Sequence, residues 1–221
     1  MTGEISARNP LFHVATFYGR RLPHLHVKER PIFITWRLHG SLPPNRIFPP
    51  ETTAGRAFVA MDRILDRAVS GPIHLTRPEI ASLTVEALIH GQDQMHHYDL
   101  HAYVVMANHV HLLITPHIAV VKITRSLKRF TAREANKKLN LTGRTFWQDE
   151  SYDHQVRDQL EFDRICRYIE VNPVRAGIVV SPSDFPWSSA TGRLQIGLRD
   201  TIPPHVTFLS DCHTNPHAAL D

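Results

Sequence analysis

The chain has 221 residues, of which 42% are hydrophobic and 21% charged, so it is long enough for one well-packed domain with extensions and too apolar for wholesale disorder. Its formal net charge of +4 is a mild basic bias that fits nucleic acid without proving it. The two cysteines give no disulfide framework, and no stretch approaches the roughly 20 apolar residues of a membrane span. Because the N-terminus also lacks a signal pattern, we expect a soluble cytoplasmic protein.

The N-terminal third begins with a mixed polar segment and then becomes periodic. Residues 1–30 show no period and are interpreted as an extension. Residues 31–38 alternate between apolar and other side chains, which predicts a strand, and a proline-rich loop follows at 40–50. Apolar residues at helical spacing predict a helix over 57–70.

A second helix is expected after Thr76. This residue and Glu79, three places on, have the spacing of a capping box, and Pro78 is tolerated in the first turn. Residues 97–106 and 109–115 then read as two strands of a hairpin. Only Ala107 and Asn108 separate them, and asparagine tolerates the left-handed conformation of a tight turn.

The second half contributes two more helices and one more strand. Residues 118–139 predict a long helix with Ile123, Leu127 and Phe130 on one side. A strand is expected within 150–158, and a helix over 159–171 that Asn172-Pro173 ends. This element order predicts an α+β fold, a ferredoxin-like or RRM-like antiparallel sheet with helices packed on one face.

The hairpin carries the first chemical signal, because His109 and His111 are two apart in a strand and project from the same face. Two adjacent imidazoles suit a divalent cation. The plainer alternative is a pair of surface histidines on a half-buried strand. A histidine-triad nucleotide hydrolase would need a third alternating histidine, where this chain has Leu113.

The last helix carries the second signal. Tyr168 and Asn172 are four apart, so they lie one above the other on the flank of the apolar stripe. Tyr168 is therefore a candidate nucleophile and Asn172 a candidate oxygen ligand near the same metal. The alternatives are an amphipathic packing tyrosine and an asparagine that only stops the helix.

The motifs "VVMANHVHLLI", "SLKRFTAREAN", "FWQDESYDHQVRD", "RYIEVNPVRAGIV" and "FPWSSA" together resemble the REP-associated tyrosine transposases, a group of the IS200-like single-tyrosine HUH transposases. The resemblance covers residues 31–191, which we take as the transposase domain between an extension at 1–30 and a polar tail at 192–221. It implies a divalent metal, Mg²⁺ or Mn²⁺, held by His109 and His111, with Asn172 completing the site and Tyr168 as nucleophile. Ala107 and Val171 stand where the family pattern has proline and asparagine.

The activity that the resemblance implies is cleavage and rejoining of single-stranded DNA at palindromic repeat hairpins through a 5′-phosphotyrosine link. His154 is the best candidate for a supporting role, against packing or a DNA contact. Basic side chains on the long helix and around the tyrosine helix are candidates for phosphate contacts, or else ordinary solvated faces: Lys122, Arg125, Lys128, Arg129, Arg133, Arg157, Arg164, Arg167 and Arg175.

Two other functions stay open from the sequence. One is a nickase of replication or conjugation that uses the same tyrosine chemistry. The other is a module that binds nucleic acid without cutting it, either an inactive relative of these transposases or an RRM-type sheet, although RRM-type sheets display aromatic side chains where this hairpin has histidines. The expected partners are single-stranded or hairpin DNA and, as a candidate, a second copy of the chain, in the nucleoid of a bacterial cytoplasm.

Overall fold

The structure is a computed structural model that describes residues 30–43 and 54–192. The predicted extension at 1–30 and tail at 192–221 therefore lie almost wholly outside the described residues, as does Cys212. The elements follow in chain order: β1 (Ile32–Arg37), α1 (Ala54–Arg67), η1 (His74–Thr76), α2 (Pro78–Asp93), β2 (Tyr98–Val105), β3 (His109–Pro116), α3 (Val120–Lys138), β4 (Tyr152–Gln155), α4 (Gln159–Arg175), η2 (Pro182–Asp184) and η3 (Ser189–Thr191).

The four strands form one antiparallel sheet in the order β2-β3-β1-β4, which confirms the predicted α+β, ferredoxin-like fold. β1 and β3 are the central strands, and Thr35 of β1 lies opposite His111 of β3. A register shift at His101 of β2 marks a bulge, which reverses the side-chain parity of that strand. The sheet therefore places the two histidines at its centre, with a strand on either side of β3.

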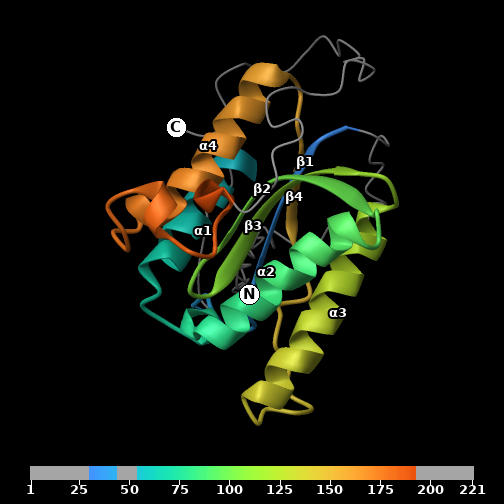
Figure 1. The fold of residues 1–221 in the computed structure, drawn as a ribbon. Coiled ribbons are helices and arrows are strands. Elements are labelled where there is room, and N and C mark those ends of the chain that lie inside the picture. The colour runs from blue at the N-terminus through green and yellow to red at the C-terminus, as the bar shows by residue number, and fades with distance from the viewer. Residues whose placement is uncertain (1–29, 44–53, 193–221) are drawn as a thin grey trace, which may run out of the picture.

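One face of the sheet packs on α2 and α3, which lie together on that side of the sheet (Figure 1). The even-numbered residues of β1 and β3, among them Ile34 and Leu112, point into this layer and are fully buried. Val110 and Leu112 thus face helices, as alternation predicts.

The opposite face is covered by α1 and α4 (Figure 1), so the expectation that the helices pack on one face was wrong. The odd-numbered positions of the central strands also carry apolar residues, Phe33 and Leu113, and these are buried against Phe58 of α1 and Ile165 of α4. A sheet that is apolar on both faces must bury both, and the second helical layer does this.

Several predicted boundaries shift for local reasons. α1 ends at Arg67 rather than at residue 70, because Ala68 adopts a positive φ of 46°. The capping box was wrong: Arg77 is the N-cap of α2, and the Thr76 hydroxyl donates to the Ile73 carbonyl instead. Pro78 does occupy the first turn.

The hairpin turn and α4 also depart from expectation. Asn108 has no positive φ, so the left-handed turn expected there is wrong, and its side chain bonds the Leu65 carbonyl and His109. α4 continues through Pro173 to Arg175, so the Asn172-Pro173 pair does not end it. Within residues 30–43 and 54–192, no helix combines the length and apolarity that a membrane crossing needs.

Candidate metal and tyrosine site

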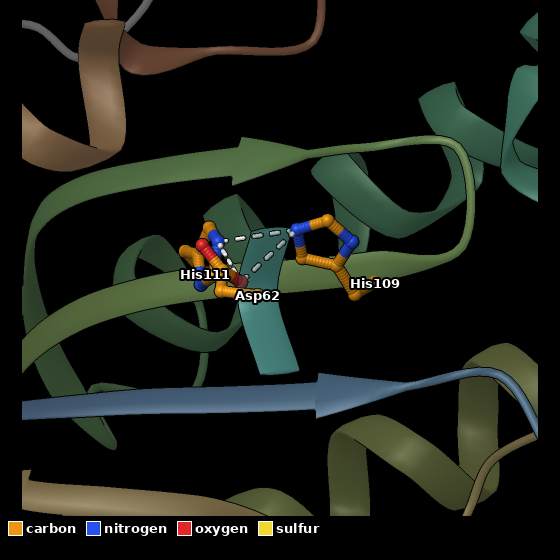
Figure 2. Close-up of side chains that lie close together, drawn as sticks. All are labelled: Asp62, His109 and His111. Carbon is orange, nitrogen blue, oxygen red and sulfur yellow. Dashed lines mark hydrogen bonds and ion pairs between the residues drawn. The ribbon is translucent and has the colours of Figure 1, made fainter. Parts of the chain in front are cut away.

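The two histidines of β3 lie on the face that α1 and α4 cover, and both are fully buried. Their Nε2 atoms are 3.1 Å apart. Asp62 of α1 points toward them, so that side chains from two elements far apart in the sequence converge on one point (Figure 2). Its Oδ1 is 3.2 Å from His111 Nε2 and 3.6 Å from His109 Nε2. Surface histidines on a solvent face, the plainer alternative, are therefore excluded.

The outer nitrogens of both imidazoles are held by neighbouring side chains. Asn108 donates from Nδ2 to the Leu65 carbonyl, so its Oδ1 faces His109 Nδ1 at 2.8 Å. Because Oδ1 can only accept, His109 carries its proton on Nδ1 and presents a bare lone pair on Nε2. Thr35 Oγ1 lies 2.7 Å from Nδ1 of His111 and fixes the orientation of that ring. Such partners orient imidazoles toward a metal.

Asp62 was missed by the sequence prediction, which treated its segment only as an amphipathic helix. It sits between Met61 and Leu65 on the buried face of α1 and is 1% exposed. A carboxylate at an apolar position is the signal that could have identified it, since buried charges require partners. Asp66 follows one helical turn later, with its Oδ1 3.7 Å from Nε2 of His109.

Tyr168 reaches the same carboxylate from α4. Its hydroxyl donates a hydrogen bond to Oδ2 of Asp62, while Oδ1 of that carboxylate faces the histidines. Its ring is edge-on to Phe33 and His111, and the Arg175 guanidinium lies 4.8 Å from the ring centroid. The structure thus brings the predicted nucleophile to the predicted histidines through a residue that was not predicted.

Asn172 lies one turn beyond Tyr168, fully buried, and its Nδ2 is 3.4 Å from His111 Nε2. Its Oδ1 is buried and finds no hydrogen-bond donor in the part of the chain that the structure describes. Asn172 therefore borders the histidines, while the three groups whose ligand atoms all lie within 4.8 Å of one another are Asp62, His109 and His111.

Burial and mutual proximity set the charges of this cluster. Burial, followed by the neighbouring His111, lowers the pKa of His109 to about 3, so the ring is neutral. Burial would raise the pKa of Asp62, but His111, His109 and the Tyr168 hydroxyl together hold it below its usual value. Burial, with the Asp62 charge adding to it, raises the pKa of Asp66 to about 7. Burial and then Asp62 raise the pKa of Tyr168.

The donor set fits a divalent cation. Three buried oxygens, Oδ1 of Asp62, of Asp66 and of Asn172, have no hydrogen-bond donor among the described residues. Asp62 and His109 offer an ionised oxygen and an unprotonated nitrogen at one point, with His111 beside them. Buried polar atoms in such number are normally satisfied, and a shared cation would satisfy them.

His154, the candidate supporting residue, lies against the start of α4 and pairs with a carboxylate there. Its Nε2 is 3.0 Å from Oε1 of Glu161, and Arg157 forms an ion pair with the same carboxylate at 2.8 Å. Glu161 is 3% exposed and also accepts from the Arg157 backbone. These residues anchor the first turn of α4, the helix that carries Tyr168 further along.

The basic candidates divide between two surfaces. The α4 group includes Arg164, Arg167 and Arg175, which are exposed on the tyrosine helix. The α3 group lies on the other helical layer. Lys128 of that helix donates to the carbonyls of Gln148, Asp149 and Glu150, so its ammonium is committed to holding a loop.

Comparison with known proteins agrees with this geometry. Residues 75–172 match the family model "Transposase IS200 like". The match contains His109, His111, Tyr168 and Asn172 but begins after Asp62, so the carboxylate of α1 lies outside it. No curated protein matches the chain in sequence.

A solved structure described as "Structure of the REP associates tyrosine transposase bound to a REP hairpin" has the same fold. The TM-score is 0.52 at 18% sequence identity, with 91% of this chain and 97% of that chain covered. The antiparallel sheet, the paired histidines and the tyrosine helix occur together in this chain. Residues 75–172 of this chain are therefore similar to the IS200-like transposase family, and the wider chain shares the fold of that solved structure.

Proposed function

We propose that the protein is a metal-dependent transposase that cleaves and rejoins single-stranded DNA at palindromic repeat hairpins, through a 5′-phosphotyrosine intermediate on Tyr168. The observation that carries this proposal is the position of Asp62. One of its carboxylate oxygens accepts a hydrogen bond from the Tyr168 hydroxyl, and the other faces the paired imidazoles. A tyrosine that only packs at the edge of a core would not need a buried carboxylate at its hydroxyl.

His109, His111 and Asp62 would hold the cation, with Asn172 beside them. An amide rotation that exchanges Oδ1 and Nδ2 would turn the Asn172 oxygen toward His111, and the two atoms are interchangeable in shape. A bound Mg²⁺ or Mn²⁺ would polarise a non-bridging oxygen of the scissile phosphate and neutralise charge that develops there.

The chain's own residues perform the transfer. Tyr168 Oη attacks the phosphorus, its proton passes to Oδ2 of Asp62, and the phosphorus–oxygen bond to the 3′ side breaks. The departing 3′-oxygen takes up that same proton from Asp62 and leaves as a 3′-hydroxyl, while the 5′-phosphate stays on Tyr168. Since one phosphodiester is exchanged for another, an incoming 3′-hydroxyl reverses the step without a nucleotide cofactor.

The α4 cations are suited to receive the scissile strand. Arg175 lies over the Tyr168 ring, and Arg167 precedes the tyrosine by one residue. Arg164 is exposed one turn earlier on the same helix. Arg157 is bound to Glu161 and contributes to the position of α4 first.

The assignment of hairpin DNA as the ligand is supported by the likeness of fold to a solved structure. The solved structure is of a transposase bound to a REP hairpin, and we extend that ligand class to this chain. We take residues 31–191 as the catalytic unit and expect it to act on chromosomal DNA at the nucleoid of a bacterial cytoplasm. A homodimer remains a prediction.

The test is to mix the full chain with labelled hairpin oligonucleotides from repeats beside its own gene, with Mg²⁺ or Mn²⁺, and to run a denaturing gel. We expect a slower, protease-sensitive band that is absent for Tyr168→Phe and for His109→Ala. Tyr152→Phe is the matched control, because Tyr152 is a second tyrosine packed against the same core cluster, and this variant should keep the band.

Three results would decide against the proposal. Hairpin binding without an adduct in either metal would favour the non-cleaving module. An adduct on Tyr152 rather than on Tyr168 would move the nucleophile. An adduct at a unique nick in long duplex DNA, with hairpins inert, would favour a nickase of replication or conjugation.

A further inference from the structure

A groove runs between α2 and α3, on the side of the sheet away from the tyrosine site. Its cavity volume is about 440 Å³, within the range of small-ligand sites. The lining is mainly apolar and includes Leu83, Ala87, Ile123, Leu127 and Phe130. Glu86, His90 and Ser126 add polar groups to its walls. The reaction proposed above makes no use of this groove.

Phe130 forms one edge of the groove. Sequence periodicity places it on the buried side of α3 with Ile123 and Leu127, yet it is 43% exposed while Leu127 is 7% exposed. Its ring also lines a second, shallower hollow further out on α3. The phenyl ring therefore stands between two concave surfaces, and the Arg133 guanidinium lies over it, 5.9 Å from the ring centroid.

That second hollow is basic. Lys122, Arg125, Arg129 and Arg133 line it, and no acidic residue does so among the described ones. Arg133 forms an ion pair with Glu134 at 2.7 Å. The other three form no ion pair with any acidic residue in the parts of the chain that the structure describes. These three cations lie on successive turns of α3, beside an apolar groove that shares Ser126 and Phe130 with their hollow.

We infer that this surface binds an unpaired stretch of DNA, with a base inserted in the groove against Phe130 and its phosphates on Lys122, Arg125 and Arg129. Charge complementarity selects a polyanion, and the adjoining apolar groove selects one whose planar rings are free to leave the stack. Duplex DNA offers the cations the same phosphates, but its bases are paired and cannot enter. Ser126, His90 and Glu86 can donate to or accept from the edge of the inserted base.

The inference depends on the proposed function only in taking DNA as the ligand. The groove and the tyrosine site lie on opposite faces of the sheet, so a strand held at α3 is retained while its other part is cut or joined. The two ideas can fail separately, because groove binding needs neither Tyr168 nor a divalent metal.

The experiment uses the full chain carrying Tyr168→Phe, in a chelator, with a labelled unstructured DNA of about 12 nucleotides, within the span that single-strand sites cover, and the corresponding duplex. Fluorescence anisotropy gives the affinity for each at several salt concentrations. Phe130→Ala is expected to weaken single-strand binding about tenfold, in line with the loss of one base stack, and to leave duplex binding and the salt slope unchanged. Arg125→Glu with Arg129→Glu should weaken both ligands and reduce the single-strand salt slope by about 1.4.

Leu160→Ala is the matched control for Phe130→Ala, because Leu160 is 70% exposed on α4 and lines neither hollow. Lys138→Glu, an exposed residue beyond the hollow on α3, is the control for charge. Equal single-strand affinity with and without Phe130 would overturn the inference, as would a duplex preference. An effect of the charge variants alone would also overturn it, because it would indicate a plain phosphate contact and leave the groove to another occupant.

Discussion

The two helical layers bury opposite faces of the same sheet, but they bury different chemistry. Between the sheet and α2 with α3 the contacts are apolar, as for Ile34 and Leu112. Between the sheet and α1 with α4, the same strands contribute Thr35 and His111 at adjacent buried positions. Neighbouring residues of a central strand therefore point to opposite layers, so that Leu112 packs in the apolar core while His111 is a candidate metal ligand.

This difference assigns separate tasks to the two layers. Apolar burial is non-directional and tolerates sliding, whereas buried polar groups must be satisfied in fixed geometry. The apolar layer can hold the sheet rigid, and the polar layer can then keep the unsatisfied oxygens of Asp62, Asp66 and Asn172 around two imidazoles. Substitutions in the cluster around Asp62, His109 and His111 should consequently change metal binding and catalysis, and those in the interior of the apolar layer should change stability.

The largest expected effect in the polar layer is that of Asp62→Asn. The variant keeps the side-chain volume but removes the charge that faces both imidazoles and accepts the Tyr168 hydrogen bond. Because outer partners of metal ligands alone cost about 10- to 100-fold, we expect both Mn²⁺ affinity and adduct rate to fall by more than about 100-fold. Calorimetry and the denaturing gel measure the two quantities.

Asp99→Asn is the control, since Asp99 pairs with His117 on an exposed surface. Unchanged Mn²⁺ affinity in Asp62→Asn would remove Asp62 from the proposed ligand set, and an unchanged adduct rate would remove its role at the tyrosine.

A smaller effect is expected from Thr35→Val, which preserves shape and removes the oxygen that lies 2.7 Å from Nδ1 of His111. Losing this partner frees the ring to change tautomer, so metal affinity should fall by about 10- to 100-fold while the protein still folds. Thr84→Val, a buried threonine of the apolar layer whose hydroxyl donates to the Ile80 carbonyl of its own helix, should leave metal affinity unaltered. Equal losses in both variants would mean that the effect is on packing.

The sequence predicted most of the fold because its signals are local and periodic. Alternation located β1 and β3, and the spacing of Phe162, Ile165 and Ile169 located α4 and placed Tyr168 on its flank. The bulge at His101 could not be predicted from the sequence, because it depends on how β2 pairs with β3. The bulge reverses which face of the sheet the following side chains of β2 point to. The second helical layer was missed for a related reason: alternation shows which residues share a face, not what covers that face.

The candidate site was predictable only where its residues share one element. His109 with His111, and Tyr168 with Asn172, follow from spacing on one strand and one helix. Asp62 joins them through packing between α1 and β3, elements far apart in the sequence, and no spacing rule reaches that far. Asn108 was predicted for its backbone, whereas its amide holds the His109 ring.

In the apolar layer, Gly91→Ala should lower the free energy of unfolding and leave the site chemistry alone. A Cβ on Gly91 would crowd the Tyr98 hydroxyl oxygen, which is itself held by a 2.7 Å bond to the Leu88 carbonyl. Overpacking of this kind costs about 1–3 kcal/mol. Chemical denaturation measures it, and Mn²⁺ affinity of the folded variant should match that of the unaltered chain.

The contact is confirmed if Gly91→Ala combined with Tyr98→Leu costs less than the two single changes added together. Additive losses would show that α2 shifts away from Tyr98, and a loss of metal affinity would show that the two layers are not independent.

A further effect on stability is expected at the start of α4, where Glu161→Gln tests whether His154 supports the helix or the chemistry. Burial would raise the pKa of Glu161, but His154 and Arg157 together lower it to about 2 from the ordinary 4.5. Since the folded-state pKa is the lower one, the carboxylate stabilises the fold above pH 4.5, and this contribution is lost as the pH falls from 4.5 toward 2. We expect Glu161→Gln to cost up to about 3 kcal/mol at neutral pH, with the difference from the unaltered chain closing over that window.

His154→Ala completes the comparison, because it removes one of the two side chains that face Glu161. If His154 acts by holding α4, its loss lowers the free energy of unfolding by a similar or smaller amount and leaves the adduct rate per folded molecule unchanged. A slower adduct with unaltered stability would instead place the imidazole in the reaction. A loss of stability with an unchanged adduct rate would mean that His154 positions the helix that carries Tyr168. The reacting groups would then be confined to Tyr168 and the cluster around Asp62.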